Sequence, residues 1–242
     1  MTQMVRVHNF AVSSDGYGAG EGQSLERPFG HADPTQLLSW ALATASWPNR
    51  TDPGGSRGLD DYLVRDFHRN IGAEVMGRNK FSPQRGPWAD HDWQGWWGQQ
   101  PPFHTPVFIM THHERPSFRL SDTAFHFVCG DPATVLQRAF EAADGKDVRL
   151  GGGANTIRQF LDADLIDTLH VAVAPVNLGA GSRLWNSPDE LLDRYHCDVV
   201  PSPSGVIHHL FWRRCQRPMG NPLRCSLTVP GAPRTDVPCG IG

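Results

Sequence analysis

The residues best suited to chemistry form a run of three glycines where a helix is expected to begin. The run 151–156 (GGGANT) follows a short β-like segment, 147–150, and precedes a helical pattern of apolar residues. Glycines let the backbone approach an anion without an intervening Cβ, and a helix start presents free N–H groups and the positive end of its dipole. The pattern therefore predicts a phosphate cradle and a nucleotide ligand. The competing interpretation is a tight strand-to-helix connection that binds nothing.

Two further clusters follow expected strands, at 76–79 (MGRN) and 111–113 (THH). Ligands of open α/β sheets bind at the carboxyl ends of the strands, so one long anionic ligand can reach all three clusters. Arg78 and His112 supply positive charge and donors for a phosphate separate from the pyrophosphate at the glycines. NADPH carries its phosphates in this distribution. Taken singly, Arg78 is also typical of a solvated turn, and His112 is typical of a polar loop.

The elements that must position these clusters alternate between strands and helices. Asp33 before Pro34 and Asp131 before Pro132 are typical N-caps, each followed by a proline in the first helical turn. Strands are expected at 5–12, 71–76, 107–110, 125–128, 147–150 and 166–176, and helices at 34–46, 59–70, 132–143 and 155–163. A closing antiparallel hairpin is expected at 196–200 and 206–213. This order predicts an α/β fold with a mostly parallel mixed sheet.

Composition narrows the functional class. The chain has 242 residues, enough for a sizeable core in one domain or two small ones, and a formal net charge of −3. This balance gives no reason to expect a nucleic acid or a membrane as partner. Five scattered cysteines without a C-x-x-C motif indicate free thiols in a reducing, cytoplasmic compartment, and no metal site is expected. The Pro- and Gly-rich tail 215–242 is expected to be poorly ordered.

Taken together, the motifs resemble those of the dihydrofolate reductase-like family, and within it the reductase domain of the bifunctional riboflavin-biosynthesis enzyme. The matching stretches cover roughly residues 5–213 in the family's order, at 13–17, 75–79, 106–111, 148–154, and 165–167 running into 174–181. The resemblance implies a three-layer fold with the sheet flanked by helices, bound NADPH and a homodimer. It also implies a reductase that transfers hydride to a C=N or C=O of a small heterocycle, such as a pterin or a ribosylaminopyrimidine.

The resemblance also assigns site residues. It places Ala11 beside the nicotinamide, and Asp15 near the nicotinamide and the substrate. The cofactor-binding residues that it implies lie near the adenosine phosphate (Gly77, Arg78, Asn79), at the adenine ribose (Thr111, His112) and at the pyrophosphate (Gly152, Gly153, Ala154, Asn155, Thr156).

The proton that accompanies the hydride needs a donor. Asp15 is the first candidate, either as donor or as the group that orients a water, and Glu21 and His31 are further candidates. On this hypothesis, Asp15→Asn should cut turnover with little change in NADPH affinity. The competing interpretation makes Asp15 an Asx-turn residue before Gly16.

The chain departs from the family pattern in two insertions, at about 21–58 and 82–106. Substrate contacts in this family come from such loops, so the resemblance to the family does not identify the substrate of this chain. The second insertion carries four tryptophans, which pack the loop to the body, fill a dimer contact or form a lid over a flat ring. Asp61 and Asp66 lie in the helix that carries the folate-binding carboxylate, but the insertion prevents equating either with it. The H-x-E match at 112–114 lacks the C-x-x-C of a zinc deaminase, so only the reductase part is expected.

Two rival functions use the same groove, because a fold does not fix a function. One is a non-catalytic nucleotide-binding protein, and the other is a flavin-dependent reductase.

Overall fold

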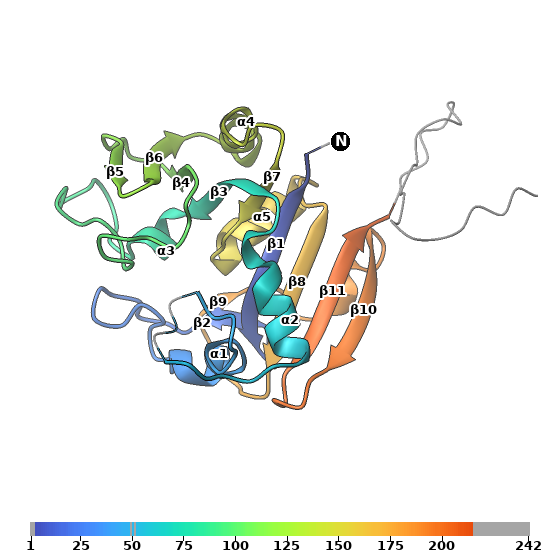
Figure 1. Ribbon diagram of the computed structural model, residues 1–242. Helices are drawn as coiled ribbons and strands as arrows, with labels where there is room; N and C mark the ends of the chain where they lie inside the picture. Colours follow the sequence, from blue (N-terminus) through green and yellow to red (C-terminus); the bar gives the residue numbers. More distant parts are fainter. Residues whose placement is uncertain (1–2, 49, 51, 215–242) are drawn as a thin grey trace, which may run out of the picture.

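A mostly parallel sheet forms the centre of the molecule. The computed structural model describes residues 3–48, 50 and 52–214, and in this part of the chain nine strands form one sheet in the order β10-β11-β8-β1-β7-β3-β4-β6-β5 (Figure 1). The strands of this sheet are Val5–Ser13 (β1), Ile71–Gly77 (β3), Val107–Thr111 (β4), Phe118–Leu120 (β5), Thr123–Cys129 (β6), Asp147–Leu150 (β7), Thr168–Ala174 (β8), Tyr195–Pro201 (β10) and Ile207–Arg213 (β11). Two short strands, Tyr17–Ala19 (β2) and Ser182–Arg183 (β9), pair separately.

The pairing directions confirm the predicted α/β class. β1 runs parallel to both β7 and β8, and β3 runs parallel to β4 and β7. The hairpin β10–β11 joins β8 in antiparallel orientation, and β5 closes the other edge antiparallel to β6. The carboxyl ends of β3, β4 and β7 therefore meet at one edge of the sheet.

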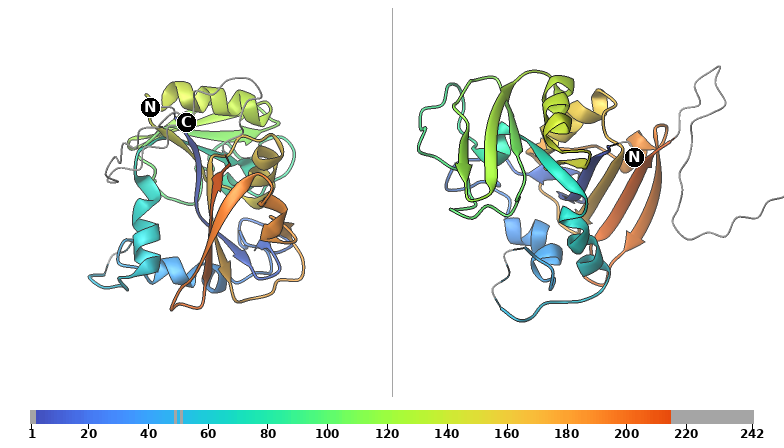
Figure 2. Two further views of the ribbon diagram at one scale, coloured as in Figure 1. Left: turned by 90° about the vertical axis from the view of Figure 1, so that its right-hand side faces the viewer. Right: turned by 45° about the horizontal axis from the view of Figure 1, so that its top comes forward.

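Helices cover both faces of the sheet, which gives three layers (Figure 2). On one face, α4 (Pro132–Ala142) and α5 (Ala154–Asp162) bury side chains such as Leu136 and Phe160 against the central strands. On the other face, α1 (Pro34–Leu42) and α2 (Leu59–Arg65) pack Trp40 and Val64 against β1 and β8. Burial of each such apolar side chain contributes about 1.5–3 kcal/mol. None of the helices in the described ranges is both long and apolar enough to cross a bilayer.

The two predicted helix starts are confirmed. The Asp33 carboxylate accepts a hydrogen bond from the backbone N–H of Thr35 at 2.8 Å, and the Asp131 carboxylate accepts one from Thr134 at 2.7 Å. Such a cap stabilises a helix by about 1 kcal/mol. Pro34 and Pro132 stand in the first turns, where no backbone donor is needed.

Several boundaries differ from those expected. The 34–46 helix ends at Leu42, because the backbone of Thr44 forms a β-bridge with Ser56 instead of continuing the helix. The 59–70 helix ends at Arg65 and tightens into a 3₁₀ turn over Asp66–His68. The short elements β2, β5, β9 and α3 (Arg78–Phe81) are too short to produce a period in the sequence. Cys129 and Cys197 are free thiols as expected, whereas Cys215, Cys225, Cys239 and the tail 215–242 lie outside the described residues.

A buried ion pair joins the two middle strands of the sheet. Glu74 on β3 and Arg149 on β7 are register partners, and their side chains are 1% and 2% exposed. The guanidinium of Arg149 donates to the Glu74 carboxylate and lies over the Phe67 ring, with its Cζ atom 3.3 Å from the ring centroid. The Lys80 ammonium lies 3.5 Å from the other oxygen of Glu74 and donates to Gly151 O at 2.7 Å. Two cations therefore share one buried carboxylate below the glycine run.

Removal of the shared carboxylate should destabilise the fold strongly. Glu74→Gln leaves Arg149 buried without a counter-charge, so we expect a loss of about 3–5 kcal/mol in the free energy of unfolding. Urea denaturation measures this loss, and Glu141→Gln at an exposed position of α4 serves as the matched control. Replacing Glu74 and Arg149 together by leucine should cost less than Glu74→Gln. A Glu74→Gln variant as stable as the Glu141→Gln control would contradict this account.

Candidate functional site

A deep cleft of about 820 Å³ opens where β3, β4 and β7 end. This volume is in the range of small-molecule and cofactor sites. The three clusters singled out in the sequence meet along its wall. The predicted residues that line it are Ala11, Gly77, Arg78, Asn79, Thr111, His112, Gly153, Ala154, Asn155 and Thr156, whereas Gly152 and Asp15 do not line it.

The glycine run leads directly into α5 and leaves its first turn open. Gly153 is the N-cap residue, no side chain caps the helix, and a Cβ on Gly153 would meet no atom within 4 Å. Thr156 is the first residue of the helix whose N–H bonds back to Gly153 O, at 3.0 Å. In the described part of the chain, the N–H groups of Ala154 and Asn155 have no recorded acceptor. These donors and the positive end of the helix dipole suit a phosphate group.

The strand that ends beside this helix must approach it closely. Gly77 donates its N–H to Gly152 O at 2.9 Å, and a Cβ on Gly77 would collide with Oγ1 of Thr156. Gly152 has a φ of 96°, in the left-handed region that favours glycine. Gly152 therefore shapes the cradle from behind, although it does not line the cleft.

Arg78 supplies positive charge at one end of the cleft. Its guanidinium stacks on Trp88, with 3.9 Å from Cζ to the ring centroid, and donates through Nη1 to Gly86 O. Its Nε and Nη2 atoms are buried and have no partner among the described residues. Burial, followed by the neighbouring charge of Arg85, lowers the pKa of Arg78. An anion at this end would accept hydrogen bonds from the free Arg78 donors, and its negative charge would counter the lowering of the Arg78 pKa by burial and by Arg85. Thr111 and His112 line the cleft here as well.

The charge of the lining is strongly one-sided. Arg78, Lys80, Arg85 and Arg149 line the cleft, and among the described residues no Asp or Glu does. Burial lowers the pKa of Lys80; Glu74 opposes this shift and Arg149 adds to it. A concave surface of one sign attracts ligands of the opposite sign. In the same part of the chain, no three His, Cys, Asp or Glu side chains gather to hold a metal ion.

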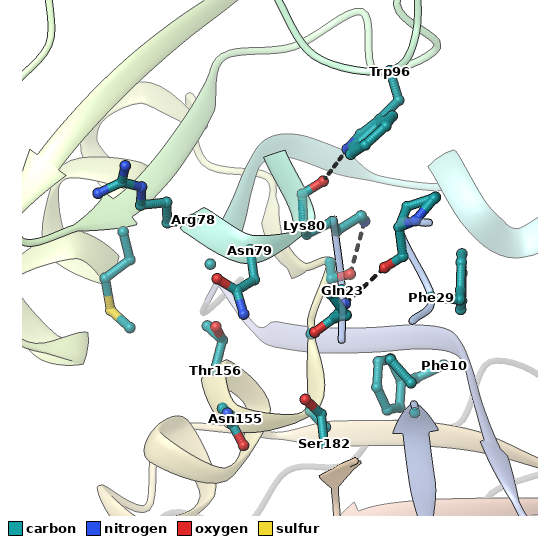
Figure 3. A pocket seen from close by; sticks show the side chains of 18 of the residues that line it. Phe10, Gln23, Phe29, Arg78, Asn79, Lys80, Trp96, Asn155, Thr156 and Ser182 are labelled. Atoms are coloured by element: carbon teal, nitrogen blue, oxygen red, sulfur yellow. Dashed lines mark hydrogen bonds between the residues drawn. The ribbon is translucent and has the colours of Figure 1, made fainter. Parts of the chain in front are cut away.

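The other end of the cleft is aromatic. Figure 3 shows Arg78 and Asn79 toward one side of the cleft and Phe10 and Phe29 toward the other, with Lys80 between them. The aromatic side chains that line the cleft are Phe10, Phe29, Trp47, Phe67, Trp96, Trp97 and Phe103. Such side chains suit the faces of a flat ring.

The Trp-rich segment is packed to the body and also contributes to the wall. Trp96 donates its indole N–H to Lys80 O at 2.9 Å, and Trp93 donates to Phe81 O at 2.9 Å. Trp97 stacks on Phe125 with 6.1 Å between ring centroids. The packing interpretation is therefore confirmed; Trp96 and Trp97 also line the cleft, and a lid over a flat ring stays a prediction.

Asp15 does not line the cleft, and its carboxylate acts as a clamp that holds two backbone segments together. Its carboxylate accepts hydrogen bonds from Ser13 Oγ at 2.6 Å, Leu178 N at 3.1 Å and Gly179 N at 2.7 Å. Burial alone would raise the pKa of Asp15, but these hydrogen bonds together lower it, which makes the group a poor proton donor. The Asx-turn bond is absent, because the N–H of Tyr17 donates to Ser13 Oγ at 3.0 Å, and the Asp15 carboxylate instead ties its turn to the backbone at 178–179. His31 braces the same loop, because its ring nitrogens contact Glu21 N at 3.0 Å and Leu178 O at 3.1 Å.

The two aspartates of the expected 59–70 helix are also engaged in contacts outside the cleft. Asp61 accepts from the backbone N–H of Ser46 at 2.7 Å, and Asp66 pairs with Arg6 at 2.8 Å. Neither lines the cleft.

Several cleft residues were missed in the sequence. Arg149 alternates with the apolar residues Val148 and Leu150 of β7, and Lys80 adjoins the 76–79 cluster. His8 and Asn9 lie in β1, three and two residues before the expected nicotinamide contact at Ala11. Burial, then the charges of Arg6 and Arg149, lower the pKa of His8 to about 3, so its ring is neutral near pH 7.

The sheet, its helical layers and the cleft at the strand ends define an α/β protein of the dihydrofolate reductase-like fold. The chain belongs to the RibD C-terminal domain family, whose model matches residues 6–198. A comparison with curated protein sequences found no match.

Two solved structures with a TM-score of 0.51 share the fold at low sequence identity. A protein from Shewanella sp. PV-4 assigned provisionally to riboflavin biosynthesis is 21% identical, with a TM-score of 0.51 over 88% of this chain and 99% of that one. RibD from Acinetobacter baumannii is 16% identical, with a TM-score of 0.51 over 88% of this chain and 58% of that one. Dihydrofolate reductase from Enterococcus faecalis, in a complex with NADP(H), is 12% identical, with a TM-score of 0.47 over 87% of this chain and 96% of that one.

The clamp interpretation of Asp15 makes a measurable prediction. Asp15→Ala removes the acceptor for two backbone N–H groups, so we expect a loss of about 1–2 kcal/mol in the free energy of unfolding. Affinity for NADPH should change less than twofold. Urea denaturation and calorimetric titration measure the two quantities, and Asp193→Ala at an exposed position is the control. Wild-type stability combined with a large loss of NADPH affinity would show that Asp15 belongs to the ligand site instead.

Proposed function

We propose that this protein is an NADPH-dependent reductase that acts on a C=N or C=O bond of a small flat heterocycle. The observation that carries this proposal is the order of features along one cleft. Arg78 with its free donors lies at one end, the open start of α5 adjoins it, and aromatic side chains form the other end. When bound, NADPH supplies the hydride, and the protein orients the reactants and excludes water.

The proposed cofactor position follows from the charges. The pyrophosphate would accept from the N–H groups of Ala154 and Asn155, and the phosphate on the adenosine ribose would contact Arg78 near Thr111 and His112. Ala11, 7% exposed on β1, would lie beside the nicotinamide. Membership of the RibD C-terminal domain family supports a reductase of this type.

The aromatic end is the proposed substrate position. A flat pterin-like or pyrimidine-like ring fits between aromatic walls, and the family's link to riboflavin biosynthesis points to the same kind of compound. Because no carboxylate lines the described cleft, we assign the proton donation to Lys80, whose lowered pKa eases the release of a proton. The homodimer and the cytoplasmic location implied by the sequence stay predictions.

Selective binding of NADPH tests the proposal. We expect NADPH to raise the melting temperature, and to bind at least about tenfold more tightly than NADH, because a charge-assisted contact to Arg78 contributes about 1.5–3 kcal/mol. Arg78→Gln should abolish this preference and leave NADH affinity unchanged. Arg138→Gln, on α4 and outside the cleft, is the matched control.

The same titration separates the rivals. Stabilisation by FMN without stabilisation by NADPH would favour the flavin-dependent reductase. Tight NADPH binding without NADPH oxidation in the presence of any pterin, aminopyrimidine or small carbonyl compound would favour a non-catalytic nucleotide-binding protein. No stabilisation by millimolar NADPH would overturn the proposal.

A further inference from the structure

A chain of hydrogen bonds, buried at its middle, crosses strands β11, β8 and β1 and ends at the cleft. The Asp60 carboxylate on α2 lies 2.8 Å from His208 Nε2 on β11. His208 Nδ1 lies 2.9 Å from His170 Nε2 on β8, and His170 Nδ1 lies 3.2 Å from the backbone nitrogen of Asn9 on β1. Both imidazoles are buried, and Trp40 packs edge-on against each of them.

The direction of this chain is fixed by its last member. A backbone N–H can only donate, so His170 Nδ1 must accept and its proton must be on Nε2. His170 then donates to His208 Nδ1, which places the His208 proton on Nε2, facing Asp60. In this arrangement every group has a partner and both rings are neutral. Burial, followed by the neighbouring histidines His208, His8 and His209, lowers the pKa of His170 well below its usual value, in agreement with a neutral ring.

This chain of hydrogen bonds positions Asn9 and does not conduct protons. The last donor is a backbone amide N–H, which does not release its proton at ordinary pH. Asn9 has a φ of 56°, in the left-handed region, and lies where the pairing of β1 with β8 shifts between Val7 and Phe10. This conformation costs a non-glycine residue roughly 1 kcal/mol, so it needs support from its surroundings. The hydrogen bond to His170 provides that support.

The side chain of Asn9 offers an unpartnered acceptor to a ligand in the cleft. Asn9 lines the cleft between His8 and Phe10, and its Oδ1 atom is buried without a partner among the described residues. The Nδ1 atom of His8 is also buried and has no partner in the part of the chain that the structure describes. A buried acceptor such as Asn9 Oδ1 normally has a donor, so a ligand that fills this end should bring an N–H group to it.

We propose that Asn9 is a specificity-determining residue that binds an N–H edge of the substrate ring through Oδ1, and that Asp60, His208 and His170 position it. The inference rests on the proposed function, since it takes the aromatic end of the cleft as the substrate position. The substrate class is then narrower than a flat ring: a heterocycle with a lactam-type or amidine-type N–H on the edge that faces β1.

Two pteridines differ in the required N–H groups and in the methyl groups that replace them, and the Asn9 variants below separate the lost donor from the added bulk. Lumazine carries ring N–H groups, and in 1,3-dimethyllumazine these are methylated. With NADP⁺ bound, the wild-type protein should bind lumazine at least about tenfold more tightly than the dimethyl compound, as expected for a buried acceptor that would otherwise lose its partner. Quenching of tryptophan fluorescence and calorimetry measure both affinities.

Variants of Asn9 test the residue itself. Asn9→Gly keeps the left-handed backbone without strain and should abolish the preference for lumazine, with NADP⁺ affinity unchanged. Asn9→Asp keeps an acceptor and should retain the preference. Asn70→Gly is the matched control, because Asn70 also has a left-handed φ, 59°, and lies outside the cleft lining.

Variants of the hydrogen-bonded residues test whether they position Asn9. Asp60→Ala should lower the ratio of the two affinities about threefold, and Asp60→Asn, which keeps an acceptor for His208, should restore it. In ¹⁵N spectra of the wild-type protein, both His170 and His208 should carry their proton on Nε2. Equal affinities for the two pteridines, or no lumazine binding at millimolar concentration by protein that binds NADP⁺, would overturn this inference alone. A failure to bind NADP⁺ would instead overturn the proposed function.

Discussion

The buried pair of Glu74 and Arg149 is the interaction on which the rest of the structure depends. It joins the two middle strands at the level where the glycine run begins, and it is completed by Lys80, which also holds the Gly151 carbonyl. Burial of charges is costly unless each one has partners, so this cluster tolerates little displacement. Two cations against one carboxylate leave the floor of the cleft positive. The same contacts that fix the strand ends therefore also set the sign of the ligand.

The remaining features extend this polarity along the cleft. The open first turn of α5 adds backbone donors beside the floor, and Arg78 adds a guanidinium at the far end. Beyond the floor, the cleft has aromatic walls and two buried polar atoms that lack a partner among the described residues, Asn9 Oδ1 and His8 Nδ1. A ligand pair that is anionic at one end and carries a flat, N–H-bearing ring at the other satisfies all of these groups. A dinucleotide with a heterocyclic substrate has that distribution.

The features that the sequence predicts well are local ones. Three glycines before a helix and the Asp–Pro helix starts express chemistry within a few residues, and the structure has them where they were expected. The cation pair could not be foreseen in the same way, because Lys80 and Arg149 meet only through the register of β3 with β7. The role of Asn9 likewise depends on a shift in strand pairing and on a histidine more than a hundred residues later in the chain. Asp15 shows the converse: its position in a family motif suggested chemistry, and its contacts are those of a clamp.

A crystal structure of the protein with NADP⁺ tests the central claim most directly. The account predicts pyrophosphate oxygens within hydrogen-bonding distance of the N–H groups of Ala154 and Asn155. It also predicts the phosphate on the adenosine ribose at Arg78, and the nicotinamide near Ala11 with the aromatic end left free. Binding in the reverse orientation, or with the pyrophosphate away from the start of α5, would contradict it.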